Sequence, residues 1–147
     1  MCGRYIVADD LDGIAGESLL SLLAQRGGAG EIFPGTDAPV LSAKGDGYAA
    51  SLAEWGFPTA SGGIIINARG ETVETKPTFA RAFSDGRCLL PTSGFFEWGE
   101  NAESGKKEKY LFTPRQRGTL YLCGLMRVFD GAPKFVVMTT SANRDMA

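Results

Sequence analysis

The chain has 147 residues, long enough for one domain with a hydrophobic core, and its 44% hydrophobic and 22% charged residues are typical of a soluble globular protein. Its net charge of −2 excludes a basic surface over the whole molecule, so any nucleic-acid binding requires a local basic groove. No apolar run approaches the roughly 20 residues of a membrane span, and no signal-peptide pattern is present. We therefore expect no membrane association and a cytoplasmic location.

The first half of the sequence predicts one helix followed by short strands. Residues 11–26 carry apolar side chains near helical spacing. Residues 40–43 and 48–55 resemble two strands around a hairpin turn at 44–47. The three isoleucines at 64–66 indicate a buried strand.

The second half predicts a short helix and further strands. The helix covers residues 78–84, with Pro77 near its first turn. Residues 87–98 are strand-like, but Pro91 and Gly94 interrupt them and indicate a bend or bulge. Three more strands are predicted at 109–113, 119–129 and 134–140. The pattern is α+β, mostly antiparallel strands with one or two helices.

Cysteine usage and the absence of histidine limit the chemistry. Cys2, Cys88 and Cys123 lack CxxC spacing, which argues against a disulfide framework and a structural zinc site. The sequence has no histidine, which removes Ser/His and Cys/His catalysis and the commonest metal ligand. We predict neither a metal nor another cofactor.

Cys2 directly follows Met1, and removal of Met1 would leave an α-amine and a thiol on adjacent carbons. The amine of such a pair can condense with an aldehyde while the thiol closes a thiazolidine ring. Reference pKa values of about 7.7–8.0 for the amine and about 8.5 for a thiol leave reactive fractions near pH 7. The alternative is that Cys2 is a small buried residue with no chemical role.

Three other segments place functional side chains among apolar residues. Trp55 and Phe57 are either core aromatics or a wedge on which bases stack. Asn67 follows three isoleucines and either caps a turn or orients a reacting group, with Arg69 on the same strand face for a phosphate. Glu97 lies among three aromatics, where it is either one half of a salt bridge or a poorly solvated carboxylate suited to proton transfer.

Five cations are candidates for DNA contacts if they converge around Cys2, and are otherwise solvated surface charge: Arg4, Arg69, Lys76, Arg81 and Arg87.

Four motifs together resemble the SRAP family (SOS-response-associated peptidases). They are Met-Cys-Gly-Arg at 1–4, Trp-Gly-Phe at 55–57, Asn-Ala-Arg-Gly-Glu-Thr at 67–72, and the segment 87–98, and they occur in the family's order and spacing. The resemblance extends through residues 138–143. It implies a strongly twisted or barrel-like sheet with peripheral helices, in a single domain spanning residues 1–147.

The resemblance also implies a function in the DNA damage (SOS) response. Members recognise abasic sites in single-stranded DNA, including junctions with duplex. They crosslink to the sugar through a thiazolidine at the N-terminal cysteine, which shields the lesion. By this resemblance Cys2 is the nucleophile, Glu97 the general acid/base and Asn67 the amide that orients the amine and the sugar.

For DNA binding, the resemblance implies that Arg4 and Arg69 contact phosphates, that Lys76 is a weaker candidate, and that Trp55 and Phe57 wedge against flanking bases. We expect a nucleoid-associated monomer whose partner is single-stranded DNA carrying an abasic site.

The sequence departs from the family after residue 143, where members carry a histidine in a further segment. We therefore expect a domain that lacks its C-terminal segment and crosslinks more slowly. Two alternatives stay open: a Cys2-dependent thiol peptidase or autopeptidase with Glu97 as the base, or a non-catalytic module that binds single-stranded DNA.

Overall fold

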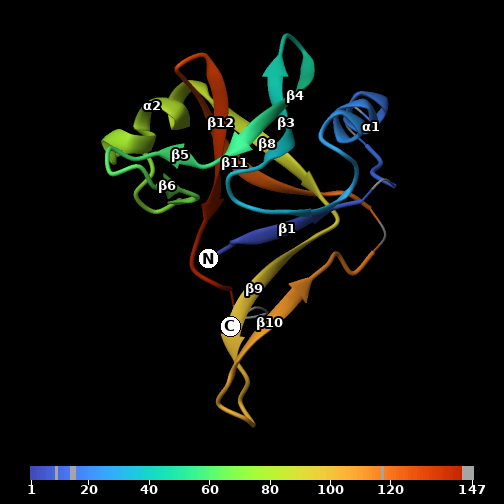
Figure 1. Cartoon of the computed structure of the whole chain (residues 1–147), viewed down its shortest axis with the longest axis vertical. Helices are drawn as coiled ribbons and strands as arrows, with labels where there is room; N and C mark the ends of the chain where they lie inside the picture. Colours follow the sequence, from blue (N-terminus) through green and yellow to red (C-terminus); the bar gives the residue numbers. More distant parts are fainter. Residues whose placement is uncertain (9, 14–15, 117, 144–147) are drawn as a thin grey trace.

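The computed structural model describes residues 1–8, 10–13, 16–116 and 118–143 and contains two helices and a majority of strands (Figure 1). The helices are α1 (Gly16–Gln25) and α2 (Pro77–Asp85). The strands are β1 (Arg4–Val7), β2 (Gly30–Ile32), β3 (Asp37–Lys44), β4 (Gly47–Trp55), β5 (Phe57–Pro58), β6 (Ile64–Ile65), β7 (Asn67–Arg69), β8 (Arg87–Thr92), β9 (Gly94–Glu100), β10 (Lys107–Phe112), β11 (Leu120–Phe129) and β12 (Ala132–Thr139). The α+β class is confirmed.

The main sheet closes on itself. Its strands follow the order β11-β8-β3-β4-β12-β7, and β11 also pairs with β12, so the five strands from β11 to β12 form a ring. Most neighbours are antiparallel, but β12 runs parallel to β4 and to β7. Lys134 lies opposite Glu54 at the parallel seam, and its Nζ is 2.6 Å from the Glu54 carboxylate. The prediction of a barrel-like sheet is confirmed.

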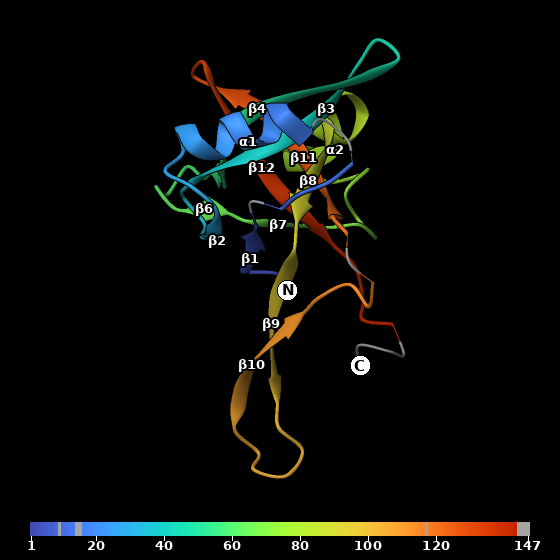
Figure 2. The ribbon, with the colours of Figure 1, turned by 90° about the vertical axis from the view of Figure 1, so that its right-hand side faces the viewer.

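A second sheet, β10-β9-β1-β2, extends away from this barrel. Its β9–β10 hairpin projects from the body of the molecule, as Figure 2 shows most clearly. The predicted interruption of 87–98 falls at Ser93, between β8 and β9. The hydroxyl of buried Thr92 donates to the Ile6 carbonyl at 2.6 Å and accepts from the Gly94 N–H at 3.1 Å. This bend carries the chain from the barrel into the second sheet.

The hydrophobic core contains the two aromatics that were candidates for DNA contact. Trp55 is 0% exposed, lies between the rings of Tyr5 and Phe135, and donates from Nε1 to the Ile66 carbonyl at 2.9 Å. Phe57 is 1% exposed in a second cluster beneath α2. The prediction that these rings wedge against bases is therefore wrong in this structure, because neither has a face open to a ligand.

Other local predictions were accurate to different degrees. Helix α2 extends one residue beyond each end of the predicted segment 78–84. Helix α1 begins at Gly16 rather than at Leu11, and residues 14–15 of that prediction lie outside the described residues. The isoleucines at 64–66 are not a buried strand: Ile64 is 45% exposed, because β6 pairs only with β5 in a two-stranded sheet. Within the described residues, no helix is long and apolar enough to cross a membrane.

Candidate functional site

A cleft of about 820 Å³ lies where the N-terminus, the β9–β10 hairpin and the end of β12 meet. Met1 and Cys2 form one side, and Phe95, Glu97 and Tyr110 come from the hairpin. Arg69 and the segment from Val137 to Asn143 complete it. The cleft thus combines segments that are distant in sequence.

Pairing of β1 with β9 brings the N-terminus to Glu97. Arg4 lies opposite Phe96, and the chain before it continues beside the hairpin. The α-amine of Met1 donates to Glu97 Oε2 at 2.8 Å, and the Glu97 side chain is 26% exposed. Of the two readings of Glu97, a carboxylate in an ion pair is therefore observed, and its partner is the chain terminus itself.

Cys2 lines the same cleft, and only 4% of its surface is exposed. Its Sγ donates to the Arg4 carbonyl at 3.6 Å. Burial raises the pKa of the thiol to about 11, the Glu97 charge contributes in the same direction, and the Arg4 contact opposes them. In this form, with Met1 in place, the thiol is protonated and shielded at neutral pH.

Two side chains at the β7–β12 pairing carry unpaired polar atoms: Thr139, which lines the cleft, and Asn67, which does not. Parallel pairing sets Asn67 beside Val137 and Arg69 beside Thr139. Both side-chain atoms of Asn67 and the Thr139 hydroxyl are buried without a hydrogen-bond partner in the described part of the chain. Buried polar groups are normally paired, so the Thr139 hydroxyl, which lines the cleft, has unused hydrogen-bonding capacity for a group that binds there.

The predicted cations do not converge on Cys2. Of the five, only Arg69 lines the cleft among the described residues. Arg4 forms an ion pair with Glu31 at 3.2 Å, and its guanidinium lies 4.4 Å from the centre of the Phe33 ring. Lys76 is exposed at the N-terminus of α2.

The other two cations are held by local contacts. Arg81 pairs with Asp85 one turn along α2, and Arg87 lies over the Phe83 ring.

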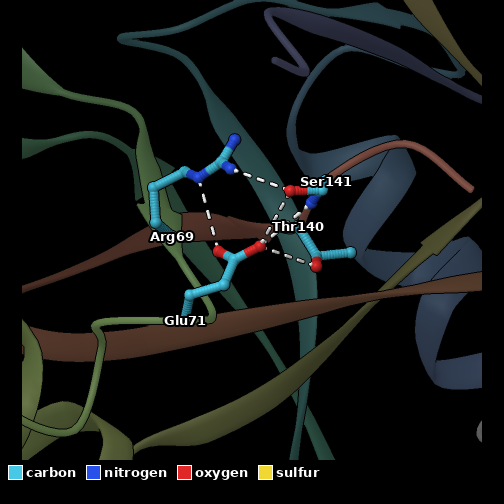
Figure 3. A network of polar contacts seen from close by, with 4 residues as sticks. All are labelled: Arg69, Glu71, Thr140 and Ser141. Carbon is cyan, nitrogen blue, oxygen red and sulfur yellow. Dashed lines mark hydrogen bonds and ion pairs between the residues drawn. The ribbon is translucent and has the colours of Figure 1, made fainter. Parts of the chain in front are cut away.

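Glu71 had no predicted role, yet it joins two walls of the cleft (Figure 3). Its Oε1 accepts hydrogen bonds from the Thr140 hydroxyl at 2.9 Å and from the Ser141 N–H at 3.0 Å. Its Oε2 is 3.4 Å from Arg69 Nε. Hydrogen bonds from its own backbone N–H and from Ser141 and Thr140, together with the Arg69 charge, lower the Glu71 pKa to about 2.

The closed sheet and the cleft that joins a cysteine, a carboxylate and an arginine define a small α+β domain with a candidate nucleophilic site at its N-terminus. Residues 1–147 match the family SOS response associated peptidase (SRAP), and the chain belongs to this family.

Named relatives and solved structures agree with this assignment. The chain is 32% identical over 110 residues to abasic site processing protein YoqW of Bacillus subtilis, an alignment covering 67% of this chain and 48% of YoqW. It is 31% identical over 110 residues to abasic site processing protein YobE of Bacillus subtilis, covering 67% of this chain and 49% of YobE. The chain thus spans about half the length of these relatives.

Among crystal structures, a phage-related protein of Bordetella bronchiseptica superimposes with a TM-score of 0.67 at 26% identity, covering 95% of this chain and 69% of that one. A second Bordetella bronchiseptica protein gives a TM-score of 0.71 at 20% identity, covering 98% and 74% respectively, and supports the fold alone.

Proposed function

We propose that this domain processes abasic sites in DNA by forming a covalent adduct through Cys2. The ion pair between the chain's α-amine and Glu97, in the same cleft as buried Cys2, is the observation that carries the proposal. Family membership and the names of the relatives support the same substrate. We further propose that the domain acts as a cytoplasmic, nucleoid-associated monomer.

The chemistry begins when Met1 is removed and the α-amine belongs to Cys2. This amine attacks the aldehyde carbon of the ring-opened sugar, and loss of one water gives an imine. The Cys2 sulfur then adds to the imine carbon while the thiol proton passes to the nitrogen, which closes a thiazolidine. Glu97 accepts and returns protons during these steps, because its carboxylate already binds the terminal amine at 2.8 Å. Asn67 orients the amine or a sugar hydroxyl with its unpaired amide.

DNA binding would depend mainly on Arg69, the cation that lines the cleft. Its guanidinium is suited to a phosphate next to the lesion. An extrahelical sugar in single-stranded DNA fits an open cleft better than a stacked base pair does. Arg4 and Lys76 lie outside this lining and would contact only more distant phosphates.

Intact-mass measurement after incubation with a single-stranded oligonucleotide carrying one abasic site tests the proposal. The expected result is a heat-stable adduct from the Met-free protein, absent in Cys2→Ala and retained in Cys123→Ala, whose thiol is exposed elsewhere. A folded, Met-free chain that forms no adduct would contradict the proposal. An adduct that survives in Cys2→Ala would assign the chemistry to another residue.

A further inference from the structure

We propose that Glu71 is a positioning residue of the cleft: it aims Arg69 at the DNA backbone and, with its other oxygen, fixes the wall formed by Thr140 and Ser141. This inference deepens the proposed function and rests on it for the DNA-binding readout. Glu71 itself is not expected to touch the reacting atoms, since it is not among the residues that line the cleft.

The two carboxylate oxygens of Glu71 make separate sets of contacts. Oε1 receives the Thr140 hydroxyl at 2.9 Å, the Ser141 N–H at 3.0 Å and the Ser141 hydroxyl at 3.4 Å. Oε2 faces Arg69 Nε at 3.4 Å. One oxygen therefore fixes the chain after β12, and the other fixes the cation, so the two effects can be separated by mutation.

Arg69 has little else to hold it in place. It lies at the end of β7, and its other contact in the described structure is a 3.4 Å hydrogen bond from Nη2 to the Ser141 hydroxyl. Because Glu71 also holds Ser141, both contacts of the guanidinium depend on one carboxylate (Figure 3). A long side chain fixed in this way loses less conformational entropy when it binds a phosphate.

The wall has the same dependence on Glu71. Residues 140–143 line the cleft but follow the last strand and have no strand pairing of their own. Gly70 reinforces the junction, where its N–H donates to the Thr139 carbonyl at 2.8 Å. Beyond that point, the hydrogen bond from the Ser141 N–H to Glu71 is a backbone contact that ties the segment to residues 69–71.

Two substitutions distinguish the two contacts. Glu71→Gln with its amide oxygen in the Oε1 position keeps an acceptor for Thr140 and Ser141, but places an uncharged donor against Arg69. Glu71→Ala removes both sets of contacts. Glu74→Gln, a nearby exposed position, provides the matched control for a change of one charge.

The experiment measures three quantities for each variant: hydrogen exchange at the Ser141 amide, affinity for an oligonucleotide with a tetrahydrofuran abasic analogue, and adduct rate at saturating abasic DNA. In Glu71→Gln we expect near-normal protection of the Ser141 amide and an adduct rate within about twofold of wild type. We expect the DNA affinity to fall about fivefold, because one oriented charge contact is lost. In Glu71→Ala the Ser141 protection is lost as well. Glu74→Gln should match wild type in all three.

Wild-type affinity in both Glu71 variants would overturn the inference, as would unchanged Ser141 protection in Glu71→Ala. An equal fall in affinity and saturated adduct rate in Glu71→Gln would also overturn it, because it would indicate general damage to the site. If the wild-type chain itself binds no DNA, the proposed function fails, while exchange at Ser141 still decides whether Glu71 holds the wall.

Discussion

The presence of Met1 determines which group pairs with Glu97. With Met1 present, its amine occupies Glu97, and the Cys2 thiol is buried with its pKa raised to about 11 by that burial. The proposed chemistry requires an amine and an accessible thiol on the same residue. With Met1 present, the α-amine belongs to Met1 and the Cys2 thiol is buried. We expect removal of Met1 to free Glu97 for the amine of Cys2 and to make the Cys2 sulfur more accessible.

The rate at which each cysteine is alkylated should show how strongly its thiol is shielded. At pH 7.5, iodoacetamide is expected to modify exposed Cys123 first and Cys2 and Cys88 far more slowly, because burial raises the pKa of these two thiols to about 11 and about 12. Raising the pH should increase the Cys2 rate about tenfold per unit up to its pKa, since only the thiolate reacts. Peptide mass spectrometry measures each site. Equal rates for Cys2 and Cys123 at pH 7.5 would contradict the buried geometry.

The two tryptophans should differ in how much each contributes to the free energy of unfolding. Trp55→Ala is expected to lower the free energy of unfolding by about 3–5 kcal/mol, because it empties the centre of the core. Trp98 is 40% exposed at the cleft, so Trp98→Ala should cost under about 1 kcal/mol. Urea denaturation at 25 °C measures both. A small cost for Trp55→Ala would restore its candidacy as a residue that contacts DNA.

At the scale of single elements, the bend between β8 and β9 orients the hairpin that carries Glu97. Thr92 is 0% exposed, and its hydroxyl contacts β1 and the start of β9 at once. Gly94 adds a close approach, since a Cβ there would lie 2.8 Å from the Phe112 carbonyl oxygen. The direction of the hairpin thus depends on one hydroxyl and one missing side chain.

Thr92→Val should therefore destabilise the protein despite its similar shape. The expected loss is about 1–3 kcal/mol in the free energy of unfolding, because the Gly94 N–H and the Ile6 carbonyl each lose a buried partner. Thr78→Val, exposed on α2, serves as the control and should stay within about 0.5 kcal/mol of wild type. Thermal or urea unfolding provides the comparison. Equal stability of the two variants would show that the bend does not depend on Thr92.

The sequence predicted elements well where the signal was local. Helix α2 was placed to within one residue at each end because Pro77 marks its start. Trp55 and Phe57 show the limit of local reading, since the same aromatic pair fits a core or a wedge until the burial of each ring is known. Glu71 had no predictable role, because its partners Thr140 and Ser141 lie 69 and 70 residues away.

At the scale of the whole molecule, a closed ring of strands supports an open second sheet. The parallel seam between β4 and β12 completes the ring, and no pattern in either strand indicates the other. A barrel-like sheet was expected only from family resemblance, whereas the closing pair became evident from the structure. The N-terminus lies where the two parts meet, fixed by β1 against β9.

Amide hydrogen exchange should be slow in the closed ring of strands and faster in the second sheet. Amides of the five ring strands β3, β4, β8, β11 and β12, which have neighbours on both sides, are expected to exchange slowest. Amides in the outer half of the β9–β10 hairpin should exchange fastest among the strands, because β10 is an edge strand with mainly exposed side chains. Strong protection across residues 101–107 would contradict this division and indicate that the hairpin is covered in solution.

The parallel seam also has a consequence for the order of events during synthesis. Among the strands that the structure describes, β12 is the last in chain order, so the ring cannot close while the ribosome is still adding residues 132–139. Glu97 likewise emerges long after Met1, with which it pairs across 96 positions. Until Glu97 has been synthesised, the α-amine of Met1 lacks its ion-pair partner. Met1 is 81% exposed even in the complete fold, whereas Cys2 is 4% exposed, so we expect folding to restrict access to Cys2 rather than to Met1.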